Sequence, residues 1–230
     1  MKKIGIIGSS GFVGKALVIS SKELDIPIIS ITKENFKKYA LETFDILIHA
    51  AMPSGKYWAK NNPFEDFKKT VDVTAEVVYN WKYKKIILIS TVSAKDYLTG
   101  HPYAVNKRIA ELLVSSKNSL IVRLGSLYGN DMEKGPLYDL LHNKQLFVDI
   151  KSQYNFINVE FCASWIFNNL DKNGIIELGA SNTLSLVEIA KKLQLNPKYD
   201  GEVETIVTEK MENSLPSTNE IWKFLEKYKK

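Results

Sequence analysis

The first seventeen residues constrain the fold more than any other stretch of the chain. An apolar run at 4–7 leads into three glycines spaced three apart, Gly8, Gly11 and Gly14, and a helix-forming segment follows. This pattern predicts a strand, a tight turn made by Gly8, and a helix that Gly14 lets pack on the strand. Gly11 would let backbone N–H groups approach a pyrophosphate, whose negative charge the helix dipole favours. The turn therefore predicts nucleotide binding at the start of a βαβ unit.

Strand-like and helical segments alternate through the first half of the chain, which indicates an α/β fold with a Rossmann-like, doubly wound parallel sheet. The predicted strands are 4–7, 27–31, 45–49, 86–90 and 120–123, and the predicted helices are 11–23, 34–40, 63–81 and 102–115. Later residues predict strands at 145–150, 174–178 and 204–208, and helices at 137–142, 160–170, 186–195 and 218–228. We expect a nucleotide-binding domain at 1–124 and a small α+β substrate lobe at 125–230, interleaved with the last strands. Ligands of such sheets bind at the carboxyl ends of the strands.

The composition excludes several other classes of protein. Of the 230 residues, 45% are hydrophobic and 25% are charged, as is ordinary for soluble globular proteins. No apolar run approaches the ~18 residues of a membrane span, and the early first strand leaves no room for a signal peptide. The single Cys162 excludes an intrachain disulfide and fits a reducing cytoplasm. Three separated histidines predict no metal site, and scattered lysines, which give a net charge of +5, predict no nucleic-acid surface.

A second informative stretch couples a tyrosine to a lysine. Tyr103 and Lys107 are four residues apart on a predicted helix, so they share one face. A free phenol, with a pKa near 10, is poorly matched to proton transfer at neutral pH, and a nearby ammonium lowers that pKa. The preceding strand ends in residues with hydroxyl groups. Thr91 or Ser93 could form a hydrogen bond with the substrate oxygen that undergoes the reaction. This constellation predicts acid–base chemistry beside a bound nucleotide.

Together these motifs resemble the short-chain dehydrogenase/reductase family, and specifically its extended branch that acts on nucleotide sugars. The three glycines resemble its cofactor turn, residues 45–51 its third-strand motif, and Thr91, Tyr103 and Lys107 its catalytic triad. Residues 123–129, 156–159 and 176–179 resemble the loop leaving its fifth strand and two segments of its substrate lobe. The resemblance implies an NAD(P)-dependent oxidoreductase with a nucleotide-sugar substrate.

The resemblance also assigns binding residues. Cofactor contacts are expected from Gly8, Ser9, Ser10, Gly11, Phe12, Val13, Gly14, Thr32, Lys33, Ala50, Ala51, Tyr103 and Lys107. Substrate contacts are expected from Ser54, Ser126, Tyr128 and Asn155, although Tyr128 could equally be a packing residue. Family members usually end the second strand with an aspartate that bonds the ribose of NAD. Residues 29–33 lack one, and their small hydroxyls and Lys33 could receive a 2′-phosphate, so we expect NADP, with NAD as the alternative.

Three reactions compete within the family. Its dehydratases resemble one another in an acidic pair directly after the catalytic threonine, but here Val92 and Ser93 follow. Its epimerases hold NAD tightly, which the missing second-strand acid disfavours. We therefore expect a reductase of a 4-keto nucleotide sugar, with a 4-epimerase as the alternative and a non-catalytic NADP-binding sensor as a third possibility. A homodimer is also possible, because Val71, Val78 and Trp81 could form a dimer face or could cover the sheet.

Overall fold

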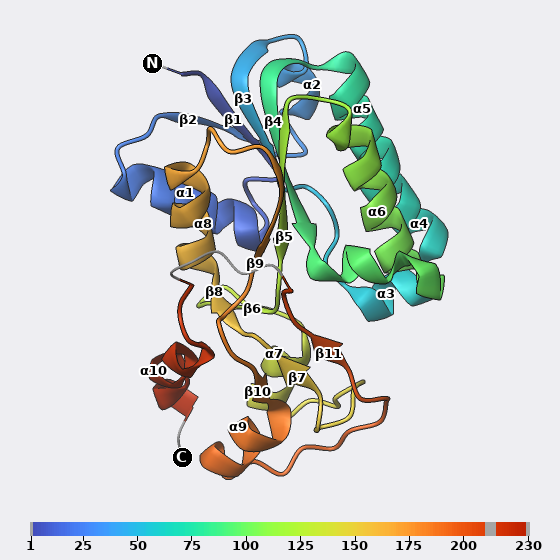
Figure 1. Ribbon diagram of the computed structural model, residues 1–230, viewed down its shortest axis with the longest axis vertical. Coiled ribbons are helices and arrows are strands. Elements are labelled where there is room, and N and C mark those ends of the chain that lie inside the picture. The colour runs from blue at the N-terminus through green and yellow to red at the C-terminus, as the bar shows by residue number, and fades with distance from the viewer. Residues whose placement is uncertain (1, 210–214, 229–230) are drawn as a thin grey trace. The chain divides into compact units, whose positions relative to one another are not determined.

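A computed structural model describes residues 2–209 and 215–228 of the chain (Figure 1). The chain divides into two compact units. The first comprises Met1–Arg123 and Glu160–Ile176, and the second comprises Leu124–Val159 and Glu177–Lys230. The chain thus leaves the first unit after its fifth strand, returns for seventeen residues and leaves again. Within the described ranges, no helix is long and apolar enough to cross a membrane.

The first unit contains the predicted sheet. Its six strands have the order β2-β1-β3-β4-β5-β9. They are β1 (Ile4–Ile7), β2 (Ile28–Ile31), β3 (Thr43–His49), β4 (Lys82–Thr91), β5 (Ser119–Leu124) and β9 (Gly174–Leu178). β1 pairs in parallel with β2 and β3, and β3 pairs in parallel with β4. Every residue of the strand β4 from Lys85 to Ser90 is buried, as expected for a strand covered on both faces. The predicted α/β fold class is confirmed.

Helices cover both faces of this sheet (Figure 1). On one face lie α1 (Phe12–Glu23) and α8 (Val159–Asn168), joined by a 3.0 Å hydrogen bond between the hydroxyls of Ser20 and Ser164. The other face carries α3 (Lys56–Asn61), α4 (Pro63–Phe67), α5 (Val73–Asn80) and α6 (Pro102–Ser115), with the short α2 (Phe36–Tyr39) near the second strand. Val78 and Trp81 pack there with the buried Phe44 and Leu88. These two residues therefore cover the sheet, which was one of the two expectations for them, and the homodimer itself stays a prediction.

The long helix predicted at 63–81 is interrupted. A π-helical turn, Lys68–Asp72, separates α4 from α5. The Thr74 hydroxyl donates to the Thr70 carbonyl at 2.6 Å, a side-chain bond of the kind that bends helices. Such π-turns are frequent at functional sites, and this one packs against α6, which carries Tyr103 and Lys107.

A buried ionic cluster fixes α6 on the sheet. Glu111 is completely buried and accepts two hydrogen bonds from Arg123 of β5, at 2.8 and 2.7 Å. Its carboxylate also accepts from Arg108 at 3.1 Å and from the Ser90 hydroxyl of β4 at 2.7 Å. Since both carboxylate oxygens are bonded, the burial of this charge is compensated. The cluster links one helix to two neighbouring strands.

The second unit contains short elements. Its two small sheets are β6 (Leu127–Tyr128) with β8 (Ile157–Asn158), and β10 (Leu184–Ser185), β7 (Gln153–Tyr154) and β11 (Thr205–Ile206) in that order. The helices are α7 (Pro136–Leu141), α9 (Leu186–Leu193) and α10 (Ile221–Leu225), the last flanked by 3₁₀ turns at Thr218–Glu220 and Glu226–Tyr228. Ser185 and Glu188 form a capping box at the start of α9.

Two predictions for this unit are wrong. Residues 145–150 do not form a strand, because only Leu146 pairs, in a single bridge with Tyr199. In the neighbouring segment, a Cβ on Gly201 would lie 2.5 Å from the Phe147 carbonyl oxygen, so the two main chains are in close contact there. Residues 127–128, expected within a loop, instead form the strand β6.

Candidate functional site

The glycine turn has the predicted conformation. Gly8 adopts a left-handed φ of +83°, and a Cβ there would lie 2.7 Å from the Ala51 Cα. A Cβ on Gly14 would overlap the Gly8 carbonyl, so the third glycine is required where the helix packs on the turn. Ile31, the last residue of β2, accepts hydrogen bonds from the N–H groups of Gly8 and Ser9. The turn is thus locked between the ends of two other strands.

Gly11 differs from the other two glycines. A Cβ on Gly11 would meet only the Gly8 carbonyl oxygen, at an ordinary 3.4 Å. Gly11 is the N-cap of α1, no side chain caps the helix, and its first turn contains no acidic residue. A side chain at Gly11 would therefore meet little of the protein itself. The role of Gly11 in binding phosphate remains a prediction, as do those of Ser9, Ser10, Phe12 and Val13.

Tyr103 and Lys107 meet on the first turns of α6. The helix begins at Pro102, and the His101 Nδ1 accepts the Tyr103 N–H at 3.2 Å. The Lys107 Nζ lies 5.2 Å from the centroid of the Tyr103 ring. Both residues are more than nine-tenths buried. The predicted neighbourhood of phenol and ammonium is therefore present.

The main chain after β3 accepts a hydrogen bond from the side chain of Lys107. The Lys107 Nζ donates to the Pro53 carbonyl at 2.6 Å. Pro53 follows the predicted cofactor residues Ala50 and Ala51 and precedes Ser54, which is exposed. The small-residue loop after β3 and the helix with the acid–base pair are thus directly linked.

The candidate hydroxyls lie at the end of β4. Thr91 is the last residue of the strand, and its hydroxyl oxygen accepts the Ser93 N–H at 3.3 Å. Thr91 is half-buried, whereas Ser93 is only 2% exposed. The role of either hydroxyl toward a substrate stays a prediction.

Sequence reasoning missed His49, the last residue of β3. The imidazole is completely buried, and its Nδ1 accepts the Ala51 N–H at 3.4 Å. Its Nε2 lies 3.1 Å from the Thr74 hydroxyl, whose own proton goes to the Thr70 carbonyl. This pattern assigns the ring proton to Nε2. Burial, together with the Lys107 charge, lowers the pKa of His49 to about 3, so the ring is neutral beside the ammonium.

The end of the second strand differs from the expectation for NADP. The Thr32 N–H donates to the Asn35 side chain, and the Thr32 hydroxyl bonds the Glu34 carboxylate. That hydrogen bond lowers the pKa of Glu34, so the residue is ionised at neutral pH. Lys33 is exposed. A carboxylate therefore stands beside the two residues that were predicted to receive a 2′-phosphate.

The remaining candidates lie in the second unit. The Asn155 amide is wedged between Gly125 and Gly179 and donates to the Ala180 carbonyl and the Thr208 hydroxyl at 3.3 and 2.7 Å. Tyr128 is 5% exposed and packs on Phe224 with ring centroids 5.2 Å apart. Ser126 is half-buried, and its carbonyl accepts the Ile157 N–H. Asn155 and Tyr128 thus have packing roles, and the substrate contacts of all three remain predictions.

No cluster of three histidine, cysteine or acidic residues suited to a metal occurs among the residues that the structure describes. The first unit brings together the glycine turn, the loop after β3, and the side chains of Tyr103 and Lys107. The fold and the turn define a Rossmann-type α/β protein.

Comparisons with known proteins narrow this class. No protein-family model matches the sequence, and no curated protein matches it. Among solved structures, the UDP-N-acetylglucosamine 4-epimerase of Methanobrevibacter ruminantium M1, in complex with UDP-N-acetylmuramic acid, superposes with a TM-score of 0.77 at 16% identity, over 99% of this chain and 96% of that one. MoeE5 with UDP-glucuronic acid and NAD gives 0.75 at 15% identity, over 88% of each chain. TunA, an NAD-dependent NDP-hexosamine 5,6-dehydratase, gives 0.74 at 14% identity, over 96% and 90%. The chain therefore shares its fold with these three solved structures, which confirms the predicted Rossmann-like α/β fold class.

Proposed function

We propose that this protein is an NAD(P)H-dependent reductase of a 4-keto nucleotide sugar. The observation that carries the proposal is the contact between the Lys107 ammonium and the Tyr103 ring, 5.2 Å from nitrogen to centroid. An ammonium beside a phenol favours the phenolate, which fits the phenol for proton transfer at neutral pH. The open Gly11 backbone at the N-terminus of α1 supports binding of the dinucleotide.

The residues of the first unit have distinct roles in this reaction. A bound nicotinamide dinucleotide supplies the hydride. The Tyr103 hydroxyl gives its proton to the alkoxide oxygen that forms as the ketone is reduced. Thr91 orients the carbonyl oxygen by donating a hydrogen bond. Lys107 would hold the cofactor ribose, and its charge stabilises the phenolate that Tyr103 becomes when it gives up its proton. The Pro53 carbonyl supports the lysine by accepting one of its N–H groups.

The cofactor proposed for the reductase is NADPH. The exposed Lys33 and the lack of an acid within β2 support a 2′-phosphate, whereas the ionised Glu34 opposes it. Fluorescence titration with NADPH and NADH separates these influences. Tighter NADPH binding that is lost in Lys33→Ala supports the proposal. Tighter NADH binding that weakens in Glu34→Gln contradicts it.

A 4-epimerase with tightly bound NAD is the second candidate. Glu34 beside Thr32 supports it, because a carboxylate at the end of the second strand suits the ribose hydroxyls of NAD. The solved 4-epimerase of similar fold supports it too. A panel of 4-keto and 4-hydroxy nucleotide sugars decides between the two. NADPH oxidation by a keto sugar identifies a reductase, and interconversion of hydroxy sugars without net cofactor use identifies an epimerase.

The variant Tyr103→Phe tests the acid–base role in either reaction. Turnover should fall by a factor of about 10² or more while cofactor affinity stays within about twofold, because only the hydroxyl proton is removed. Tyr97→Phe on the neighbouring 3₁₀ helix, Val92–Thr99, is the matched control, and this ring is 41% exposed. Full activity of Tyr103→Phe would remove the catalytic assignment. Cofactor binding without turnover of any nucleotide sugar by the native protein would favour a sensor.

We also propose a homodimer formed through α4 and α6. These helices contact each other, and Phe64, Phe67 and Leu112 on them are 67%, 37% and 53% exposed. Exposed apolar side chains on adjacent helices are typical of an interface. Sedimentation analysis should give a dimer for the native chain and a monomer for Phe64→Asp. A native monomer at high micromolar concentration contradicts the proposal.

A further inference from the structure

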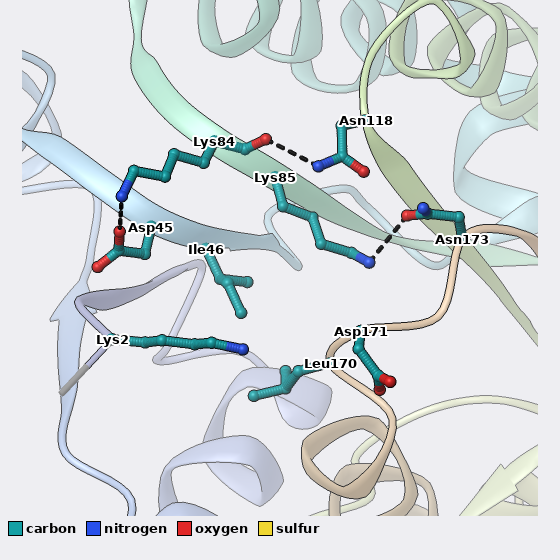
Figure 2. A pocket seen from close by; sticks show the side chains of 9 residues that line it. All are labelled: Lys2, Asp45, Ile46, Lys84, Lys85, Asn118, Leu170, Asp171 and Asn173. Atoms are coloured by element: carbon teal, nitrogen blue, oxygen red, sulfur yellow. Dashed lines mark hydrogen bonds and ion pairs between the residues drawn. The ribbon is translucent and has the colours of Figure 1, made fainter.

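A second candidate binding site lies at the amino ends of the strands in the first unit (Figure 2). A hollow of about 660 Å³ is bounded by the residues that precede or begin β1, β3, β4, β5 and β9. The candidate catalytic residues follow the opposite, carboxyl ends of the strands. Lys85 in the hollow and Thr91 at the carboxyl end are six residues apart along β4, or about 20 Å. A ligand in this hollow would therefore not compete with the predicted nucleotide.

Lys85 is the buried cation of this hollow. It is 7% exposed, and its Nζ donates to the Lys172 carbonyl at 2.5 Å and to the Asn173 side-chain oxygen at 2.8 Å. An ammonium has three N–H groups. Within residues 2–209 and 215–228, these two bonds leave one N–H of Lys85 available to a ligand.

The charges around the hollow do not balance. Lys84 and Asp45 neutralise each other in an ion pair of 2.7 Å. Of the other lining residues, Lys2 and Lys85 are cationic and Asp171 is anionic, which leaves a surplus of one positive charge. Burial lowers the pKa of Lys85, Asp171 raises it, and Lys2 lowers it further, so the two ammonium groups repel each other. Figure 2 shows both lysine side chains extending toward the same space.

We propose that this hollow binds the phosphate group of a small metabolite, between the ammonium groups of Lys2 and Lys85. A phosphate monoester carries nearly two negative charges at neutral pH and offers three acceptor oxygens, which suits a hollow lined by two cationic side chains. The free amide N–H₂ of Asn173, whose oxygen accepts from Lys85, provides a neutral donor on the same side. The hollow has the size of typical small-molecule sites, and Ile46 and Leu170 provide apolar surface for the rest of the ligand.

Calorimetric titration at constant ionic strength tests the proposal, with inorganic phosphate and glucose 6-phosphate as probes. The native protein should bind at least one of them saturably. Lys2→Ala should weaken binding about fivefold or more, the effect of one ion pair in water, and Asp171→Asn should tighten binding by a similar factor. Lys22→Ala, which removes an exposed lysine at the end of α1, is the control and should bind as the native protein does.

The two probes and the variants have distinct outcomes. Tighter binding of glucose 6-phosphate assigns the ester as the ligand, and equal or tighter binding of inorganic phosphate assigns the free ion. The proposal is overturned if neither probe binds at millimolar concentration. It is also overturned if Lys2→Ala and Asp171→Asn bind as the native protein does, because the phosphate then occupies another place such as the glycine turn. Lys2 is exposed and has no hydrogen bond within the described residues, so its replacement should leave the fold intact.

Discussion

Mild acid should destabilise this protein through the imidazole of His49. The ring is completely buried at the end of β3, between the Ala51 N–H and the Thr74 hydroxyl. Protonation would remove the Nδ1 lone pair that accepts from Ala51 and would bury a second positive charge beside Lys107. The folded protein therefore keeps this ring neutral, whereas the unfolded chain lets it titrate normally.

The size of the effect follows from the two pKa values. The pKa of His49 is about 3 in the folded protein, against 6.5 for an unperturbed histidine. Between these two pKa values the unfolded chain binds more protons than the folded protein. The contribution of His49 to stability is therefore fully present above the unfolded pKa and is lost as the pH falls toward the folded pKa. Each pH unit below the unfolded value costs about 1.4 kcal/mol, so lowering the pH from about 8 to about 5 should cost about 2 kcal/mol of unfolding free energy.

Urea unfolding followed by tryptophan fluorescence at these two pH values measures the loss. The variant His49→Gln is uncharged at both, so its stability should fall by about 2 kcal/mol less than that of the native protein. His142→Gln, which replaces an exposed histidine, is the control and should respond as the native protein does. Carboxylates that titrate near pH 4 contribute equally to all three proteins and cancel in the comparison. Equal losses in the native protein and His49→Gln would show that the buried ring is not the acid-sensitive group.

Three further predictions concern the turn, the buried ionic cluster and a helix cap. Gly14→Ala should cost about 2 kcal/mol or more in urea unfolding, because its Cβ overlaps a main-chain carbonyl. Gly11→Ala, which meets nothing closer than 3.4 Å, should keep its stability yet weaken dinucleotide binding; equal destabilisation of the two would contradict this distinction. Glu111→Ala should cost about 3–5 kcal/mol in the same assay, because the guanidinium of Arg123 loses its two hydrogen bonds to the buried carboxylate, and a loss below 1 kcal/mol would be inconsistent with that reason. Ser185→Ala should lower the free energy of unfolding by about 1 kcal/mol, because the capping box is lost. Ser185→Asp should keep most of the native stability, because aspartate also caps helices.

Local signals in the sequence were sufficient for most of the first unit. The strand and helix around the glycine turn and the bounds of α6 were predicted because glycine conformation, apolar period and a proline at the helix start act within a few residues. The π-turn at Lys68–Asp72 was not predicted, since it depends on which carbonyl the Thr74 hydroxyl takes.

Structural features that depend on contacts between residues far apart in the sequence were harder to predict. The expected strand at 145–150 has an apolar pattern but lacks a regular neighbour, and a strand needs one to form. The environment of His49 includes the charge of Lys107, which lies 58 residues later in the chain. No local pattern in the sequence reveals that these two residues are close in space. For Asn155 the informative signals are Gly125 and Gly179, two small residues that make room for its amide. Their common role becomes clear only when the three segments are seen together.

The discontinuous path of the first unit also has a consequence during synthesis on the ribosome. Residues 160–176 join Met1–Arg123 only after the intervening segment has been translated. Until then, the amine of Lys85 lacks its two acceptors, and β5 has no β9 on its outer side. A nascent chain that pauses in this interval presents an uncovered strand edge, which is the kind of surface that pairs with other chains and recruits chaperones. The six-stranded sheet can therefore be completed by β9 only late in synthesis, when most of the polypeptide has already emerged from the ribosome.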